Sequence, residues 1–130
     1  MASRDKKDLR LELVQAYEKA VEKYSALYPN EPQPFITCTF RSFEEQNKLF
    51  NSKPKVTNAK GGQSPHNYNP SFAFDIAFIG VNKKVVWTAK YFKMFADCIK
   101  SDVVSWGGNF KKLVDMPHFE LKDWKTYIKK

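Results

Sequence analysis

Cysteine is scarce in this sequence. Its 130 residues include only Cys38 and Cys98, which lie far apart in the chain. Such a pair is not the dense disulfide framework of a small secreted scaffold, although one bridge between the two remains open. Neither cysteine has a second Cys or a His at short spacing, so neither is expected to bind zinc. We expect two buried free thiols, the first in a strand and the second in a helix.

Long apolar runs and long basic runs are also missing. No segment has the pattern of a signal peptide or a membrane span, and no run of five or more basic residues marks a nucleic-acid-binding arm. The net charge is nevertheless +8, from 22 Lys and Arg against 14 Asp and Glu. This balance favours an acidic partner: nucleic acid, an anionic membrane surface or an anionic cell-wall polymer. We expect a monomer made in the cytoplasm, with no stable membrane insertion and no nucleic-acid partner.

The apolar content predicts one packed domain. Hydrophobic residues make up 42% of the chain and aromatic residues 15%, which is enough for a core. Periodicity predicts both helices and strands. Helices are expected at 8–27, 43–50 and 89–100, and strands at 35–40, 71–79, 84–87, 103–106 and 117–121. The interval 51–70 is expected to be a long loop, 1–34 a helix with its linker, 35–121 the core and 122–130 a tail that contains one helical turn.

Three sequence details position side chains within these elements. Ser42 followed by Glu45 forms a capping box that opens a helix, and Arg41 ends the preceding strand on its polar side. In the run 71–79, aromatic and aliphatic residues alternate with small ones, and Asp75 lies on the face of small residues. That face leaves room for a ligand above the sheet.

Histidine is as scarce as cysteine, and both histidines stand near carboxylates. His66 precedes Asp75 by a short interval, and His118 follows Asp115. A hydrolytic zinc ion is usually held by three protein ligands and keeps one position open for a water, whose pKa falls to about 7. We therefore expect His66, Asp75 and His118 to be the ligands of one zinc ion. Asp115 is the candidate for proton transfer and Arg41 for stabilising an oxyanion.

Each of these residues also has a structural interpretation. A lone histidine beside aromatic residues is often a satisfied core residue, and Arg41 could simply form a salt bridge with Asp75. Glu120 could orient the site, act as a fourth ligand or lie at a sheet edge. Trp106 is expected to belong to the core rather than to a substrate platform, and Ser64 to be a hydrogen-bonding loop residue rather than a nucleophile.

The motifs resemble a known family. SPHNYNPSFAFD is similar to the SxHxxGxAxD motif, and DMPHFE to the (D/E)xxH segment, of the zinc peptidases of family M15, which include D-Ala-D-Ala carboxypeptidases and phage L-alanyl-D-glutamate endolysins. TFRSFEEQ and the Trp106-Gly107-Gly108 stretch support the resemblance, which spans about 36–121. It implies the α+β fold of the Hedgehog signalling domain, in which helices flank an antiparallel sheet. It also implies zinc bound by the three residues named above, Asp115 as general base and Arg41 on the substrate or its oxyanion.

One departure from the family pattern concerns spacing. Eight residues separate His66 from Asp75 where the family usually has six, and Asn69-Pro70-Ser71 stands in place of a single Gly. We expect the additional residues to bulge outward while His66 and Asp75 still converge.

The resemblance leaves the substrate bond open. We expect an endolysin that cuts the L-Ala-D-Glu bond of peptidoglycan stem peptides and reaches the wall with the help of a separate, holin-like protein. The alternatives are a D-Ala-D-Ala carboxypeptidase or dipeptidase with the same site, and a non-catalytic zinc-containing wall-binding module.

Overall fold

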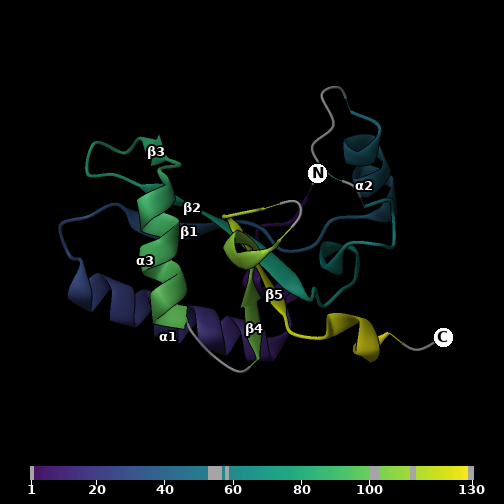
Figure 1. The fold of residues 1–130 in the computed structure, drawn as a ribbon, viewed down its shortest axis with the longest axis horizontal. Coiled ribbons are helices and arrows are strands. Elements are labelled where there is room, and N and C mark those ends of the chain that lie inside the picture. Colours follow the sequence, from purple (N-terminus) through teal and green to yellow (C-terminus); the bar gives the residue numbers. More distant parts are fainter. Residues whose placement is uncertain (1, 53–56, 58, 100–102, 112–113, 129–130) are drawn as a thin grey trace.

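One antiparallel sheet organises the molecule. The computed structural model describes residues 2–52, 57, 59–99, 103–111 and 114–128. The strands are β1 (Gln33–Cys38), β2 (Ala73–Ile79), β3 (Val85–Val86), β4 (Val104–Trp106) and β5 (His118–Leu121). Their order is β1-β2-β5-β4, and β3 pairs with the end of β2 (Figure 1). The predicted α+β class is confirmed.

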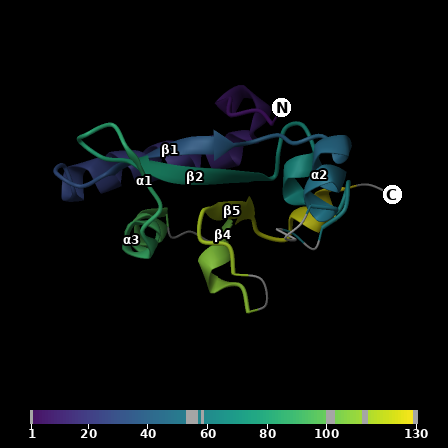
Figure 2. The same ribbon diagram turned by 90° about the horizontal axis from the view of Figure 1, so that it is seen from above.

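Within the described residues, three helices and four short 3-10 turns complete the fold. The helices are α1 (Leu11–Leu27), α2 (Phe43–Phe50) and α3 (Ala89–Ile99), and the turns are Lys6–Asp8, Pro65–Asn67, Gly107–Asn109 and Trp124–Tyr127. Seen from above, α3 and much of α1 lie at one end of the sheet and α2 lies at the other (Figure 2). No helix in the described part of the chain is long and apolar enough to cross a bilayer.

The core lies on one face of the sheet. The alternation predicted for β2 places Phe74, Ile76 and Phe78 on that face, and all three are fully buried. The ring of Tyr17, from α1, meets Phe74 edge-on, and the ring of Phe92, from α3, meets Phe78 in the same way. Helices α1 and α3 therefore seal this face and leave the opposite one, which carries Asp75, for other contacts.

The capping box of α2 is present as predicted. The Ser42 hydroxyl accepts a hydrogen bond from the Glu45 backbone amide at 3.1 Å, and the Glu45 carboxylate accepts one from the Ser42 amide at 3.0 Å. These bonds satisfy amides that an uncapped helix would leave unpaired. The helix then brings Gln46, its buried residue, under the Arg41 side chain.

The predicted bounds of α1 and β1 were wrong, and β2 begins at Ala73 rather than at residue 71. Helix α1 begins at Leu11 rather than at residue 8, because Ser71 bonds the backbone of Asp8 and Arg10 and forms a β-bridge with Leu9. Strand β1 covers 33–38 rather than 35–40, because the backbone beyond Cys38 pairs with Ser3 instead. Pro34 is tolerated within β1 because this strand lies at the sheet edge, where one side needs no ladder bonds.

Candidate metal centre

Asp75 and His118 meet because their strands pair. In the register of β2 with β5, Asp75 lies directly opposite His118. Residues directly opposite in an antiparallel pair point to the same side of the sheet. The neighbouring residues Phe74 and Phe119 stack on each other in the core. The site is thus built on the reverse face of the same two strands that carry the core.

His66 reaches this face from the loop before β2. The 3-10 turn at Pro65–Asn67 is capped by Ser64, whose hydroxyl accepts a hydrogen bond from the His66 amide at 3.2 Å. The Arg41 amide donates to the His66 carbonyl at 2.8 Å. These backbone bonds place the buried His66 ring against Asp75, and they give Ser64 the hydrogen-bonding loop position expected from the sequence.

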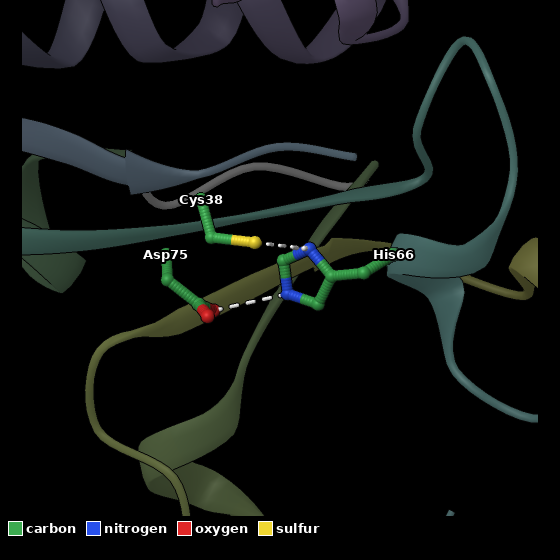
Figure 3. A group of neighbouring side chains, drawn as sticks. All are labelled: Cys38, His66 and Asp75. Atoms are coloured by element: carbon green, nitrogen blue, oxygen red, sulfur yellow. Dashed lines mark hydrogen bonds and ion pairs between the residues drawn. The ribbon is translucent and has the colours of Figure 1, made fainter. Parts of the chain in front are cut away.

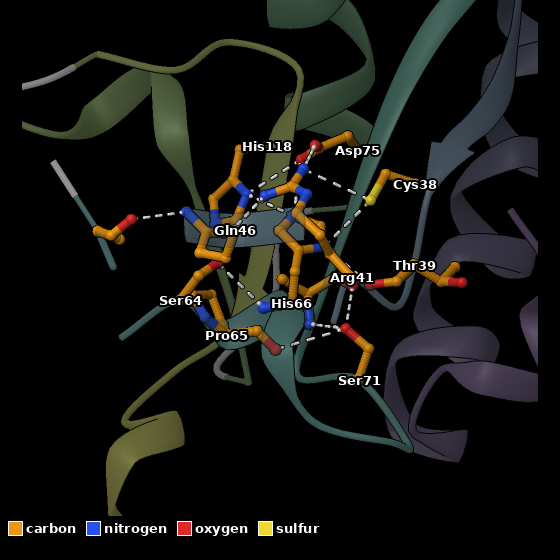
Figure 4. A network of polar contacts seen from close by, with 12 residues as sticks. Cys38, Thr39, Arg41, Gln46, Ser64, Pro65, His66, Ser71, Asp75 and His118 are labelled. Carbon is orange, nitrogen blue, oxygen red and sulfur yellow. Dashed lines mark hydrogen bonds and ion pairs between the residues drawn. The ribbon is translucent and has the colours of Figure 1, made fainter. Parts of the chain in front are cut away.

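Three potential ligand atoms converge (Figure 4). Nε2 of His66 lies 3.2 Å from Oδ1 of Asp75 and 3.3 Å from Nδ1 of His118, and that Nδ1 lies 3.0 Å from the same Asp75 oxygen. Atoms that bind one zinc ion tetrahedrally at about 2.0–2.1 Å are separated by about 3.3–3.4 Å. The three atoms therefore have the spacing of a tetrahedral metal site.

The other nitrogen of each ring already has a hydrogen-bond partner. Nδ1 of His66 is 2.8 Å from the Thr39 carbonyl, and Nε2 of His118 is 2.7 Å from a Glu120 carboxylate oxygen. Because a carbonyl and a carboxylate accept hydrogen bonds, each of these nitrogens carries its hydrogen. The nitrogens that face Asp75 are then the ones free to offer lone pairs to a cation, which is the usual arrangement of metal-binding histidines.

The electrostatics of the cluster favour positive charge. Burial acts to raise the pKa of the Asp75 carboxyl, but the two imidazoles outweigh burial and hold that pKa well below its ordinary value. Burial also acts to lower the pKa of both imidazoles, yet the negative charge and hydrogen bond of Asp75 raise it. Without a metal ion, protons on the imidazoles balance the negative charge of Asp75. A cation between the three atoms would supply that positive charge instead. The residues present fit a zinc ion.

Arg41 lies beside the cluster. Its guanidinium is 3.8 Å from Oδ2 of Asp75 and donates to Gln46 Oε1 at 2.9 Å. Gln46 is itself held by a bond from its amide to the Ala59 carbonyl at 2.8 Å. The predicted salt bridge with Asp75 and the predicted place at the site are therefore both present, and helix α2 fixes the direction of the arginine.

Cys38 is the residue that sequence reasoning missed. Its thiol lies 3.7 Å from Nδ1 of His66 and 3.6 Å from the Arg41 guanidinium, and one atom from each of Cys38, His66 and Asp75 lies within 4.8 Å of the others (Figure 3). The thiol approaches the ring nitrogen that faces Thr39, on the other side from Nε2. His118 and Asp75 both approach Nε2 of His66, whereas the thiol approaches Nδ1, so the set of two histidines and one aspartate fits a single ion better than the set with Cys38.

A bulge explains why Cys38 was missed. The β1–β2 register is regular up to Ile36, shifts, and resumes with Cys38 opposite Asp75. The simple alternation that placed Cys38 on the apolar face breaks at this bulge. Both cysteines are free, as expected, although Cys98 is half-buried rather than buried.

A pocket of about 740 Å³ opens over the cluster. Arg41, the three potential ligands, Glu120 and Asp115 line it, and the C-terminal turn adds Trp124 and Lys125 to its wall. Partial burial of the Asp115 carboxyl, followed by the nearby charge of Asp75, raises the pKa of Asp115. A carboxylate with a raised pKa is suited to accept and return a proton.

Gly107 allows Asp115 to approach the site. A Cβ atom at this position would collide with the Asp115 carbonyl oxygen and crowd Cβ of His118. Trp106, the preceding residue, stacks on Phe119 and donates from its indole to the Met116 carbonyl at 2.7 Å. Trp106 is not among the residues that line the pocket, in agreement with the interpretation that it belongs to the core.

The longer spacing between His66 and Asp75 does not separate them. Asn69 and Pro70 are exposed and bulge outward as expected. Ser71 does not follow them, since it is fully buried and its hydroxyl donates to the Ala73 carbonyl at 2.7 Å. Only two residues therefore extend the loop.

Comparisons with known proteins agree in sequence and in fold. Residues 57–121 match the family model described as D-alanyl-D-alanine carboxypeptidase. The chain is 33% identical over 100 residues to the peptidoglycan L-alanyl-D-glutamate endopeptidase CwlK of Bacillus subtilis, over 66% of this chain and 59% of that protein. It thus spans less than two thirds of that relative's length. The crystal structure of the Serratia marcescens L-Ala D-Glu endopeptidase ChiX superposes with a TM-score of 0.70 and 20% identity, covering 98% of this chain and 92% of the other.

Proposed function

This chain belongs to the D-alanyl-D-alanine carboxypeptidase family of peptidases, family M15, and from that membership we propose that it is a zinc peptidase of bacterial cell-wall stem peptides. The observation that carries the proposal is the convergence of two imidazole nitrogens and one carboxylate oxygen, 3.0–3.3 Å apart, at the floor of a pocket. We assign His66, Asp75 and His118 as ligands of one zinc ion. When bound, zinc polarises a carbonyl and makes water acidic enough to act as a nucleophile near neutral pH.

Asp115 supplies proton transfer in this proposal. Its carboxyl lines the pocket with the ligands, and burial followed by the charge of Asp75 raises its pKa, which makes it a better proton acceptor. It takes a proton from the attacking water and delivers it to the leaving amine. A site that only held a structural metal would have no use for a carboxylate in this position.

Arg41 and Glu120 have separate roles. The Arg41 guanidinium, oriented by Gln46, offers fixed positive charge to the oxygen that becomes negative during attack. Glu120 accepts the Nε2 hydrogen of His118 and so fixes the orientation of that ring. The open pocket leaves space for a peptide between Arg41 and Asp115.

We propose the L-Ala-D-Glu bond as the bond that is cut. The relative matched in sequence and the protein matched in structure are both described as endopeptidases for this bond. The alternative is removal of a terminal D-alanine, which the description of the family model favours. The net charge of +8 speeds encounter with anionic wall material in either case. A lytic, phage-endolysin role with a holin-like helper stays a prediction.

Digestion of purified peptidoglycan tests the proposal. Mass spectrometry of the products distinguishes new N-terminal D-Glu peptides from released D-alanine, while metal analysis of the same sample measures zinc. We expect D-Glu peptides and one zinc ion per chain. Asp115→Asn should lower kcat by roughly 10²- to 10⁴-fold with zinc content unchanged. Wall binding without hydrolysis by either protein would instead identify a non-catalytic module.

A further inference from the structure

The tip of the β2–β3 hairpin carries apolar side chains exposed to solvent. Val81 is 93% exposed, Trp87 58% and Val85 49%. Ile79, which pairs with Val85 next to the turn, is also exposed. We call the surface formed by residues 79–90 the hairpin surface. It lies at the end of the sheet opposite α2, away from the residues that line the pocket (Figure 1).

The turn that presents these side chains is held by hydrogen bonds. The Gly80 amide donates to the Lys84 carbonyl at 2.9 Å, and the Lys83 amide donates back to the Gly80 carbonyl at 2.9 Å. The Asn82 side chain accepts a further bond from the Lys84 amide at 3.1 Å. Trp87 stacks on Phe92 of α3. The exposed apolar groups are thus held outward by hydrogen bonds and packing instead of folding back onto the core.

The hairpin surface is also basic. The segment from Ile76 to Ala96 contains four lysines and no acidic residue. Lys83, Lys84 and Lys90 are exposed and form no ion pair with any residue that the structure describes, whereas Lys93 pairs with Asp97 at 2.7 Å. One acidic residue of the neighbouring strand end, Glu31, lies two residues before Gln33, the partner of Ile79 in β1, and it has no ion-pair partner among the described residues.

We propose that the hairpin surface binds the interface of an anionic phospholipid bilayer. Exposed valine and tryptophan can enter the boundary between headgroups and acyl chains, where tryptophan is favoured, while lysines reach anionic headgroups. Each lysine close to such a surface raises partitioning roughly fivefold. A hydrated anionic polymer would use the lysines but would give the nearly fully exposed Val81 nothing apolar to contact. This adsorption is peripheral and does not depend on the proposed peptidase activity.

Sedimentation with vesicles tests the proposal. The full chain is mixed with phosphatidylcholine vesicles, and separately with vesicles that also contain phosphatidylglycerol, at low and high salt. We expect binding to the anionic vesicles, and weaker binding at high salt. Lys83→Gln with Lys84→Gln should weaken binding about 25-fold. Val81→Ser should weaken it at both salt concentrations, since it removes the apolar contact.

Matched variants and a spectroscopic signal identify the surface. Lys19→Gln with Lys23→Gln removes the same charge from α1, and Leu11→Ser removes an exposed apolar residue there, so both should bind nearly as the unaltered chain does. The vesicle-induced blue shift of tryptophan fluorescence should disappear in Trp87→Phe. The proposal is overturned if anionic vesicles are not bound, if the α1 variants lose as much binding as the hairpin variants, or if purified anionic wall polymer is bound through Lys83 and Lys84 while vesicles are not.

Discussion

The two imidazoles of the site direct different ring nitrogens toward the cluster. His66 turns Nδ1 to the Thr39 carbonyl and Nε2 to the cluster, while His118 turns Nε2 to Glu120 and Nδ1 to the cluster. In both rings a hydrogen-bond acceptor holds the hydrogen of one nitrogen, so the protein fixes which nitrogen faces the cation once that nitrogen has lost its proton. The rings therefore need no rotation to offer their lone pairs, and the cost of organising the site is met during folding.

Glu120 provides the test of this arrangement. Glu120→Gln retains the shape of the side chain but removes the negative charge that holds the His118 hydrogen. Zinc affinity should fall by roughly 10- to 100-fold, which competition with a chelator measures. Glu12→Gln, on the exposed side of α1, is the matched control and should leave affinity unchanged. Equal affinity in the Glu120 variant would make this residue an ordinary edge carboxylate.

Gly107 allows the close contact between the 107–109 turn and the Asp115–His118 segment. In Gly107→Ala the new methyl group would meet the Asp115 carbonyl, which also accepts the His118 amide at 3.1 Å. We expect a loss of about 1–3 kcal/mol in the free energy of unfolding, measured by urea titration. In Gly80→Ala the nearest atom to the new methyl group belongs to the movable Asn82 side chain. The free energy of unfolding of this control should therefore fall less. Equal losses would contradict the proposed clash.

At the scale of elements, β2 carries the core on one face and the site on the other. One row of its side chains packs under α1 and α3, and the other row carries Asp75. Because side chains of a strand alternate between faces, the core and the site are fixed by the same register. A shift of one residue in the pairing would exchange the buried phenylalanines and the carboxylate.

Helix α2 gives a prediction at this scale. Ser42→Ala removes the cap and should cost about 0.5–2 kcal/mol in the free energy of unfolding. Because α2 carries Gln46, which holds Arg41, the variant should also raise KM or lower kcat modestly. Thermal and urea unfolding measure the first effect, and peptide hydrolysis the second. Glu44→Ala, in the same first turn but outside the capping box, should change stability less than Ser42→Ala, and the reverse order would contradict this role of the cap.

Local signals allowed the prediction of much of this arrangement. The capping box depends on Ser42 and Glu45 alone, and the alternation of β2 depends on adjacent residues, so both were predicted from the sequence. The start of α1 and the end of β1 depend on backbone pairing with Ser71 and Ser3, which are distant in the chain. The position of Cys38 depends on a bulge that no local pattern indicates. Long-range pairing therefore decided what sequence reasoning could not.

At the scale of the whole molecule, buried tyrosines make stability depend on alkaline pH. Burial raises the pKa of the Tyr17 hydroxyl to about 12, against about 10 in an unfolded chain. The stabilising contribution is complete below pH 10 and is lost as the pH rises towards 12, because only the unfolded chain ionises in that window. Burial raises the pKa of Tyr24 as well.

Unfolding by urea at a series of pH values measures this dependence. The free energy of unfolding should fall between pH 10 and 12, by up to about 3 kcal/mol for Tyr17. Tyr17→Phe removes the ionisable group while retaining the ring that packs on Phe74, so its decline should be smaller. A decline of the same size in this variant would assign the effect to other groups.

The outward bulge at Asn69 and Pro70 has a consequence for how the family can vary in length. Residues can be added or removed there without moving His66 or Asp75, because Asn69 and Pro70 are exposed to solvent. The bridge between Ser71 and Leu9 fixes the chain after the loop. The same change a few positions later, within β2, would turn Asp75 away from its partners. Length variation among relatives should thus collect at this bulge, which is also where a foreign peptide could be spliced in with the least disturbance.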